Sequence, residues 1–350
     1  MIPYYAVLLF AFLISLLARN ENSRALRSIS FLLLVILLCS FAALRDQSVG
    51  SDTSNYVLYF NLYDDFSAIS QYSLEYGYGL FNVLIRKLSN DSSVLFAAIA
   101  MSVLVPTLVT IYRGTGRVDI AIFVFIAMGF YTFSFNGARQ GIAAAITFSA
   151  LPFLFQRKNL YFFCFVIFAA SFHKSALLFF LLYFFKNLNS LRSMLIANSC
   201  FLLVLMLSSS TLMRLIGEMD DRYSSYGLKG DGGGGVYVTF LVALAVFFSW
   251  ILSRIKYYND QYKFLLNVYL IGVAISIFAV LSSVNPSGLL RFSYYFTYSS
   301  ILIWPLIFLN LAGGIRQAVF GFFLIFYVIY FGLTTSSFGS LVPYVFAWQF

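Results

Sequence analysis

The chain alternates between long apolar runs and short polar stretches. Its apolar segments lie at 2–18, 26–44, 92–112, 119–133, 138–155, 160–172, 174–185, 194–212, 236–253, 263–283, 290–309 and 317–334. Several approach the roughly 20 apolar residues that a helix needs to cross a ~30 Å hydrocarbon core. A membrane barrel would need strands of alternating polarity instead. The pattern predicts an all-α polytopic membrane protein: one transmembrane domain over 1–350, with about 10–12 spans.

Composition agrees with this fold class and narrows the chemistry. Apolar residues make up 61% of the chain and charged residues 10%, and the mean hydropathy is +0.88. The first apolar run follows Met1 directly, without a basic region or a cleavage pattern, so we expect a retained span and not a signal peptide. The three cysteines lie inside apolar runs without pair spacing, and there is one histidine and no HExxH or CxxC motif. We expect no disulfide, metal or cofactor.

The net charge of +9 is explained by topology. With the N-terminus outside, the inner loops hold thirteen of the 22 basic residues and three of the 13 acidic ones. Such an excess of cytoplasmic Lys and Arg is the usual orientation signal of membrane proteins. We therefore expect a multi-pass membrane protein with lipids, and no nucleic acid, as the partners of its basic charge.

Two longer polar stretches then face outward. Residues 45–91 carry aromatic and apolar positions at roughly helical spacing, interrupted by YGYG at 76–79, and predict two short amphipathic helices on the outer face. Residues 213–235 end in DGGGG and predict a flexible loop. A mobile lid and a slack connector both fit this second stretch.

The segment 160–185 allows two topologies. A single long helix would place Lys174 inside the membrane and reverse every later loop. Two short segments that meet at His173–Lys174 preserve the charge asymmetry, and we prefer them. Their junction should be buried in protein or line a wet cavity, because irregular backbone is not tolerated against lipid.

Basic side chains at the outer ends of separate helices are the candidates for ligand binding. They are Arg45, Arg139 in FNGARQ, Lys174 beside His173 in FHKSA, and Arg291 in SGLLRFSYY. A guanidinium pairs bidentately with phosphate and stays charged at any relevant pH. Together these groups predict a pyrophosphate site at the membrane surface. The alternative is that each neutralises a nearby carboxylate or reaches to lipid headgroups.

His173 is the candidate general base, because an imidazole can titrate near neutral pH. A lone histidine in a structural role is the alternative. Asp52 is the reserve base. The other carboxylates of the outer loop are further candidates for a base or for cation binding, although most should be solvated: Asp46, Asp64, Asp65 and Glu75.

Six ordered sequence elements resemble those of the EpsG-type, or Wzy-like, bacterial polysaccharide polymerases. They are LRDQSVGSDTSNYVLYF at 44–60, EYGYGLFNVLIRKLS at 75–89, FNGARQGIAAAI at 135–146, FHKSALLFF at 172–180, RFSYYF at 291–296 and LVPYVF at 341–346. The resemblance spans almost the whole chain. One departure is the glycine-aspartate pair before Tyr56, which reads GSD at 50–52.

The resemblance implies a metal-independent glycosyltransferase similar to the multi-helix, lipid-phosphate-dependent (GT-C-like) class. It would polymerise O-antigen, capsule or exopolysaccharide repeat units, taking the growing chain from undecaprenyl diphosphate to the non-reducing end of another lipid-linked unit at the outer face. A flippase and a chain-length regulator of the same pathway would be its partners. Arg139 and Arg291 would grip the diphosphate, Arg45 and Lys174 would assist, and His173 would activate the acceptor.

Other functional classes remain open from the sequence. A lipid-linked sugar flippase or exporter would also line a cavity with arginines, but internal repeats are expected there and none is evident. A membrane acyltransferase could use the same His and Arg, with its polar groups more often on the cytoplasmic side. An O-antigen ligase shares the chemistry and differs only in its acceptor.

Overall fold

The computed structural model describes residues 1–19, 23–72, 74–212, 214, 234–254, 260–282, 286–311 and 313–347. Over these residues the chain is helical, and the one isolated β-bridge pairs Arg45 with Phe346. Nine helical segments of the described chain are long and apolar enough to span a membrane, and three apolar helices are shorter. The prediction of an all-α polytopic membrane protein is confirmed.

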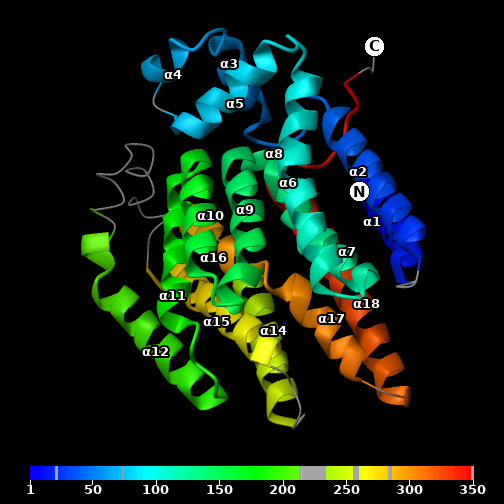
Figure 1. Ribbon diagram of the computed structural model, residues 1–350, viewed down its shortest axis with the longest axis vertical. Coiled ribbons are helices and arrows are strands. Elements are labelled where there is room, and N and C mark those ends of the chain that lie inside the picture. Colours follow the sequence, from blue (N-terminus) through cyan, green and yellow to red (C-terminus); the bar gives the residue numbers. More distant parts are fainter. Residues whose placement is uncertain are drawn as a thin grey trace. The chain divides into compact units, whose positions relative to one another are not determined.

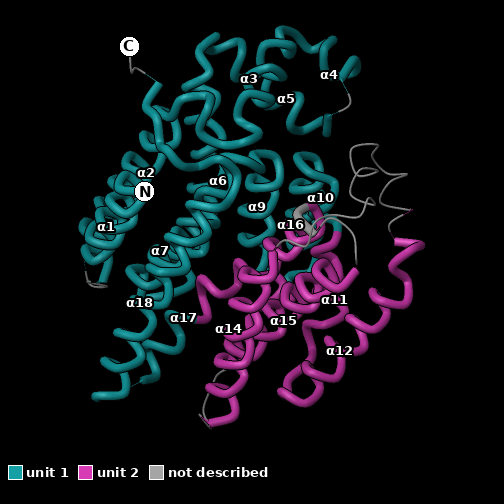
Figure 2. The backbone as a smooth tube through the Cα atoms, turned by 180° about the vertical axis from the view of Figure 1, so that it is seen from behind, with its two compact units in different colours: residues 1–153, 158–177, 304–350 teal, residues 154–157, 178–303 magenta. Residues whose placement is uncertain are grey.

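The helices form two compact units, coloured separately in Figure 2. Unit 1 contains residues 1–153, 158–177 and 304–350, and unit 2 contains 154–157 and 178–303. Glu75, Arg139 and His173 all lie in unit 1.

Unit 1 is built from apolar helices around a buried central pair. Its helices are α1 (Ile2–Leu16), α2 (Arg24–Ala43), α6 (Ser92–Gly114), α7 (Val118–Ala127), α8 (Phe130–Asn136), α9 (Ala138–Phe155, to residue 153), α10 (Asn159–Phe172) and α18 (Gly313–Ser337). Caps fix where some of them begin: Leu26 N donates to Ser23 Oγ in α2, and Ser93 N donates to Asp91 Oδ1 in α6. The stretch Val118–Asn136 is 94% buried, against 28% for α2, so α7 and α8 form the centre of unit 1.

The polar stretch 45–91 folds into three short helices at one end of unit 1 (Figure 1). They are α3 (Thr53–Leu62), α4 (Ala68–Gln71) and α5 (Tyr76–Arg86), so the prediction of two helices was wrong by one. Tyr63, Ala68 and Val83 pack into their small shared core. The YGYG sequence does not interrupt the pattern, because it forms the first turn of α5.

The C-terminal segment of unit 1 lies along the start of this polar stretch. Ala347 N donates to Leu44 O, Asp46 N donates to Val345 O, and Ser51 N donates to Gly339 O, each at 2.9 Å. Tyr344 lies over Phe41 with ring centroids 4.2 Å apart, and its hydroxyl donates to Phe41 O. The segment thereby fixes the connection between α2 and α3.

The apolar segment 160–185 breaks at His173, as the two-segment prediction required. Helix α10 ends at Phe172, and His173 caps it in an extended conformation with φ −157° and ψ 115°. A 3₁₀ stretch, η2 (Lys174–Phe180), follows, and then α11 (Leu181–Phe185). The break places His173 outside both helices.

Unit 2 is organised around α15 (Asp260–Leu281), which packs against α12 (Leu191–Leu207), α14 (Gly235–Arg254) and α16 (Pro286–Thr297). Helix α17 (Ser300–Asn310) begins in unit 2 with residues 300–303, and its residues 304–310 belong to unit 1. The capping box of Ser190 and Ser193 fixes the start of α12. The predicted flexible loop 213–235 lies outside the described residues, apart from positions 214, 234 and 235.

Candidate functional site

Glu75 joins Arg139 and His173 in unit 1. Arg139 Nη1 donates to Glu75 Oε2 at 2.5 Å, and His173 Nδ1 lies 2.9 Å from Glu75 Oε1. The side chains are 4% exposed at Glu75, 9% at His173 and 17% at Arg139. A carboxylate, an imidazole and a guanidinium, brought together from three separate segments and largely removed from solvent, are typical of a catalytic or binding centre.

Arg139 is held by the first turn of α9. Ala138 N donates to Tyr56 Oη at 3.0 Å, and the Tyr56 hydroxyl donates to Asn136 O at 3.2 Å. Asn136 in turn donates through Nδ2 to Gly339 O at 3.0 Å. Helix α3 and the C-terminal segment therefore fix the end of α9 from which Arg139 extends.

A close approach of two helices brings Glu75 to His173. Gly77, in the first turn of α5, faces α10, where a Cβ would lie 2.7 Å from the Ser171 carbonyl oxygen and closer still to its hydroxyl. Only glycine permits this separation. Glu75 precedes α5 and His173 follows α10, so the packing at Gly77 sets the distance between their side chains.

The charge balance favours an ionised Glu75. Burial raises the pKa of its carboxyl, but the His173 hydrogen bond and the Arg139 charge more than offset burial and hold the pKa well below its usual range. The carboxylate accepts a hydrogen bond from Nδ1–H and thereby orients the His173 ring. In the neutral imidazole with its proton on Nδ1, Nε2 is the proton acceptor.

Tyrosine rings shield this cluster. The Arg139 guanidinium lies 6.0 Å from the centroid of the buried Tyr78 ring, and Tyr78 meets Tyr56 edge to face at 6.2 Å. Burial raises the pKa of the Tyr78 hydroxyl far above its usual value, so this side chain stays neutral. The rings place the ionic groups in surroundings where electrostatic interactions are stronger than in water.

The structure brings together some of the residues predicted to form the site. Lys174 adjoins His173; its backbone N lies 3.4 Å from Glu75 Oε1 and its side chain is exposed. Asp52 precedes α3 and accepts from Ser51 Oγ at 3.3 Å. Arg291 lies in α16, which belongs to unit 2, whereas the Glu75 cluster belongs to unit 1.

Arg45 occupies a different setting from the one predicted for a phosphate ligand. It is 2% exposed, and its guanidinium lies 4.1 Å from the Phe96 ring centroid and 4.3 Å from that of Phe135. Its Nη1 donates to Ala42 O at 2.5 Å. Burial lowers the Arg45 pKa to about 10, which still leaves the side chain charged at neutral pH. Arg45 therefore packs the end of α2 against α6 and α8.

Glu75 was only one of several carboxylate candidates in the sequence, most of them expected to be solvated. Its partners are 64 and 98 residues away along the chain. One local signal was available, because Glu75 directly precedes the glycine pair of YGYG, which allows close helix packing. Among the described residues, no three His, Cys, Asp or Glu side chains are placed to hold a metal ion.

Comparison with known families decides the relationship. The EpsG family matches residues 28–346, and therefore both compact units. The chain belongs to the EpsG family. No curated protein and no solved structure matches it.

Membership of the EpsG family supports a polysaccharide-polymerase-like role for this membrane protein. The matched region contains Glu75, Arg139 and His173, together with the C-terminal segment that fixes α9.

Proposed function

We propose that this EpsG-family protein polymerises lipid-linked oligosaccharide repeat units at the outer face of the bacterial cytoplasmic membrane. The donor is the growing glycan on undecaprenyl diphosphate. The acceptor is a hydroxyl at the non-reducing end of another lipid-linked unit. The single observation that carries the proposal is the buried Glu75 bridge between Arg139 and His173.

The base in this scheme is His173. Glu75 accepts a hydrogen bond from Nδ1–H, which leaves Nε2 to take the proton from the acceptor hydroxyl. The acceptor oxygen forms a bond to C1 of the donor sugar. The bond between C1 and the diphosphate oxygen breaks, and its electron pair leaves with undecaprenyl diphosphate. A buried carboxylate that orients a histidine stabilises the imidazolium that forms during this step.

Arg139 is the group that stabilises the leaving diphosphate. A guanidinium has five N–H donors, and Glu75 accepts from one of the two at Nη1. Other donors of Arg139 can therefore bind a phosphate oxygen. Fixed cationic donors aimed at developing charge are among the largest contributions to catalysis. Lys174 adds charge beside His173. Asp52 is the reserve base.

The distribution of basic residues supports the outer orientation, with the 45–91 stretch, and with it Glu75, on the side away from the cytoplasm. The lipid carrier would present its diphosphate at that membrane surface. The pathway's flippase would supply the substrate there, and a chain-length regulator would act on the product.

Deletion of the gene, followed by gel electrophoresis of lipid-linked glycans, tests the proposal. A single repeat unit should accumulate on the carrier, and complementation with the wild-type gene should restore the polymer ladder. Long chains that build up without transfer to their final acceptor would indicate a ligase instead. Repeat units retained on the cytoplasmic side would indicate a flippase.

A further inference from the structure

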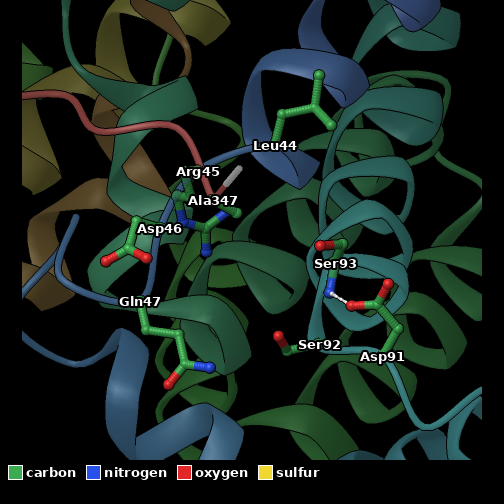
Figure 3. A pocket seen from close by; sticks show the side chains of 8 residues that line it. All are labelled: Leu44, Arg45, Asp46, Gln47, Asp91, Ser92, Ser93 and Ala347. Carbon is green, nitrogen blue, oxygen red and sulfur yellow. Dashed lines mark hydrogen bonds between the residues drawn. The ribbon is translucent and has the colours of Figure 1, made fainter. Parts of the chain in front are cut away.

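A polar pocket lies in unit 1, where α2 ends and α6 begins (Figure 3). Its volume is about 420 Å³, within the ~300–1,000 Å³ range of small-molecule sites. The lining residues are Leu44, Arg45, Asp46, Gln47, Asp91, Ser92, Ser93 and Ala347. None of them belongs to the Glu75 cluster, so the pocket is a separate feature of the same unit.

Hydrogen-bonding groups of both kinds face this pocket. Gln47 offers an amide donor and acceptor, Ser92 offers a hydroxyl, and Asp46 and Asp91 offer carboxylate oxygens. Asp91 uses Oδ1 for Ser93 N at 2.8 Å, which holds the carboxylate in place at the start of α6. A dense mixture of donors and acceptors suits the hydroxyl groups of a sugar.

Arg45 forms the buried wall of the pocket. It lines the pocket, is 2% exposed, and has a buried Nε that donates no hydrogen bond within the described chain. An atom buried to this degree is out of reach of a molecule in the pocket, so Arg45 contributes its positive charge to the pocket and not this donor. Figure 3 shows the Arg45 guanidinium between Asp46 and Gln47, which follow α2, and the residues at the start of α6.

The charges of the pocket restrict the class of ligand. Arg45 contributes one positive charge, and Asp46 and Asp91 contribute two negative charges, so the lining is negative by one. A phosphate or another anion would be repelled by the two carboxylates. Two carboxylates and an arginine are also a poor set for a divalent cation, which needs more oxygen ligands. A neutral polyhydroxylated ligand fits the balance best.

We propose that this pocket is a glycan subsite that holds a neutral sugar residue of the substrate chain, through Gln47, Ser92 and the two carboxylates. The proposal rests on the proposed polymerase function and adds to it a binding place for the sugar, apart from the groups that handle the diphosphate. The stretch 45–91 contributes to both places, with Asp46 and Gln47 at its start and Glu75 at the turn into α5.

Direct binding measurements on the full-length protein in lipid nanodiscs test the subsite. The probe is a set of lipid-free oligosaccharides of one to three repeat units, released by partial acid hydrolysis from the host's own polymer. Gln47→Ala should weaken binding about fivefold, the effect of losing one neutral hydrogen bond, and Ser92→Ala should act similarly. Gln71→Ala is the matched control, because Gln71 is exposed on α4 and does not line the pocket.

Equal dissociation constants for Gln47→Ala, Ser92→Ala and wild type would overturn the subsite. So would absence of oligosaccharide binding to the wild type, or binding that phosphatidylethanolamine in the nanodisc abolishes, since the pocket would then hold a lipid headgroup. Failure of the polymerase proposal is seen separately, as unchanged lipid-linked glycans after gene deletion.

Discussion

Replacing Glu75 by glutamine removes the negative charge that Arg139 and His173 share. The amide is close in shape to the carboxylate, so the packing of α5 against α10 at Gly77 is kept. What changes is the electrostatics, because the amide leaves the Arg139 guanidinium uncompensated and no longer accepts hydrogen bonds through both of its terminal atoms. Glu75→Gln therefore isolates the role of the charge.

The size of the effect follows from the contacts. An ionised carboxylate that is 4% exposed accepts two short hydrogen bonds, at 2.5 and 2.9 Å. Each such bond contributes about 1.5–3 kcal/mol, and glutamine keeps part of one, so we expect a loss of about 2–4 kcal/mol of stability. General-base catalysis contributes about 10²–10⁴ in rate, and a misoriented His173 should lose most of it.

The assay is polymer formation in membranes that carry the variant, with protein abundance measured through a fluorescent fusion. Glu75→Gln should lower the rate of chain extension by about 10²–10⁴ while folded protein is still recovered. Asp64→Asn makes the same chemical change at an exposed position of the same stretch and should behave as wild type. A Glu75→Gln variant with a normal polymer ladder would refute the reasoning.

Other perturbations test parts of the same cluster. Arg139→Ala should abolish long-chain polymer on gels while the protein stays inserted and abundant; unchanged chain length would remove Arg139 from the site. Gly77→Val should force α5 away from Ser171, which should abolish polymer and lower the melting temperature. Gly321→Val is the control and should change neither, because a Cβ at Gly321 meets open space. Because the Glu75 pKa is lowered in the folded protein, its charge stabilises the folded state at pH values above the unfolded pKa of ~4.3. This stabilisation is lost as the pH falls from there toward the folded pKa. The difference in melting temperature between wild type and Glu75→Gln should hold at neutral pH and shrink below about pH 4; a gap that widens there would contradict the assignment.

The fold class could be read from the sequence because hydrophobic runs of membrane length leave few alternatives. The break at His173 was also predictable, since two polar residues divide a run that is otherwise apolar, and the basic residues favour the shorter segments. Both inferences depend on local pattern and on membrane thickness. The helix count of the 45–91 stretch depends on packing within that stretch, and there the prediction was wrong.

The partners of Glu75 could not be read from the sequence, because they come from α9 and the end of α10, far along the chain. A carboxylate in a polar stretch gives no local sign of whether it is solvated or buried. Arg45 shows the opposite case: its position at the end of a span indicated a phosphate ligand, yet packing surrounds it with Phe96 and Phe135. Long-range contacts decide which of the charged residues form a site.

Reconstitution of the purified protein with its substrate tests the central claim most directly. The wild-type protein alone, in liposomes that contain undecaprenyl-diphosphate-linked repeat units, should produce a ladder of polymer on the lipid carrier. His173→Gln should reduce the rate of ladder formation by about 10²-fold or more. A ladder formed equally well by His173→Gln would contradict the assigned base, and wild-type protein that leaves the repeat units unextended would contradict the polymerase itself.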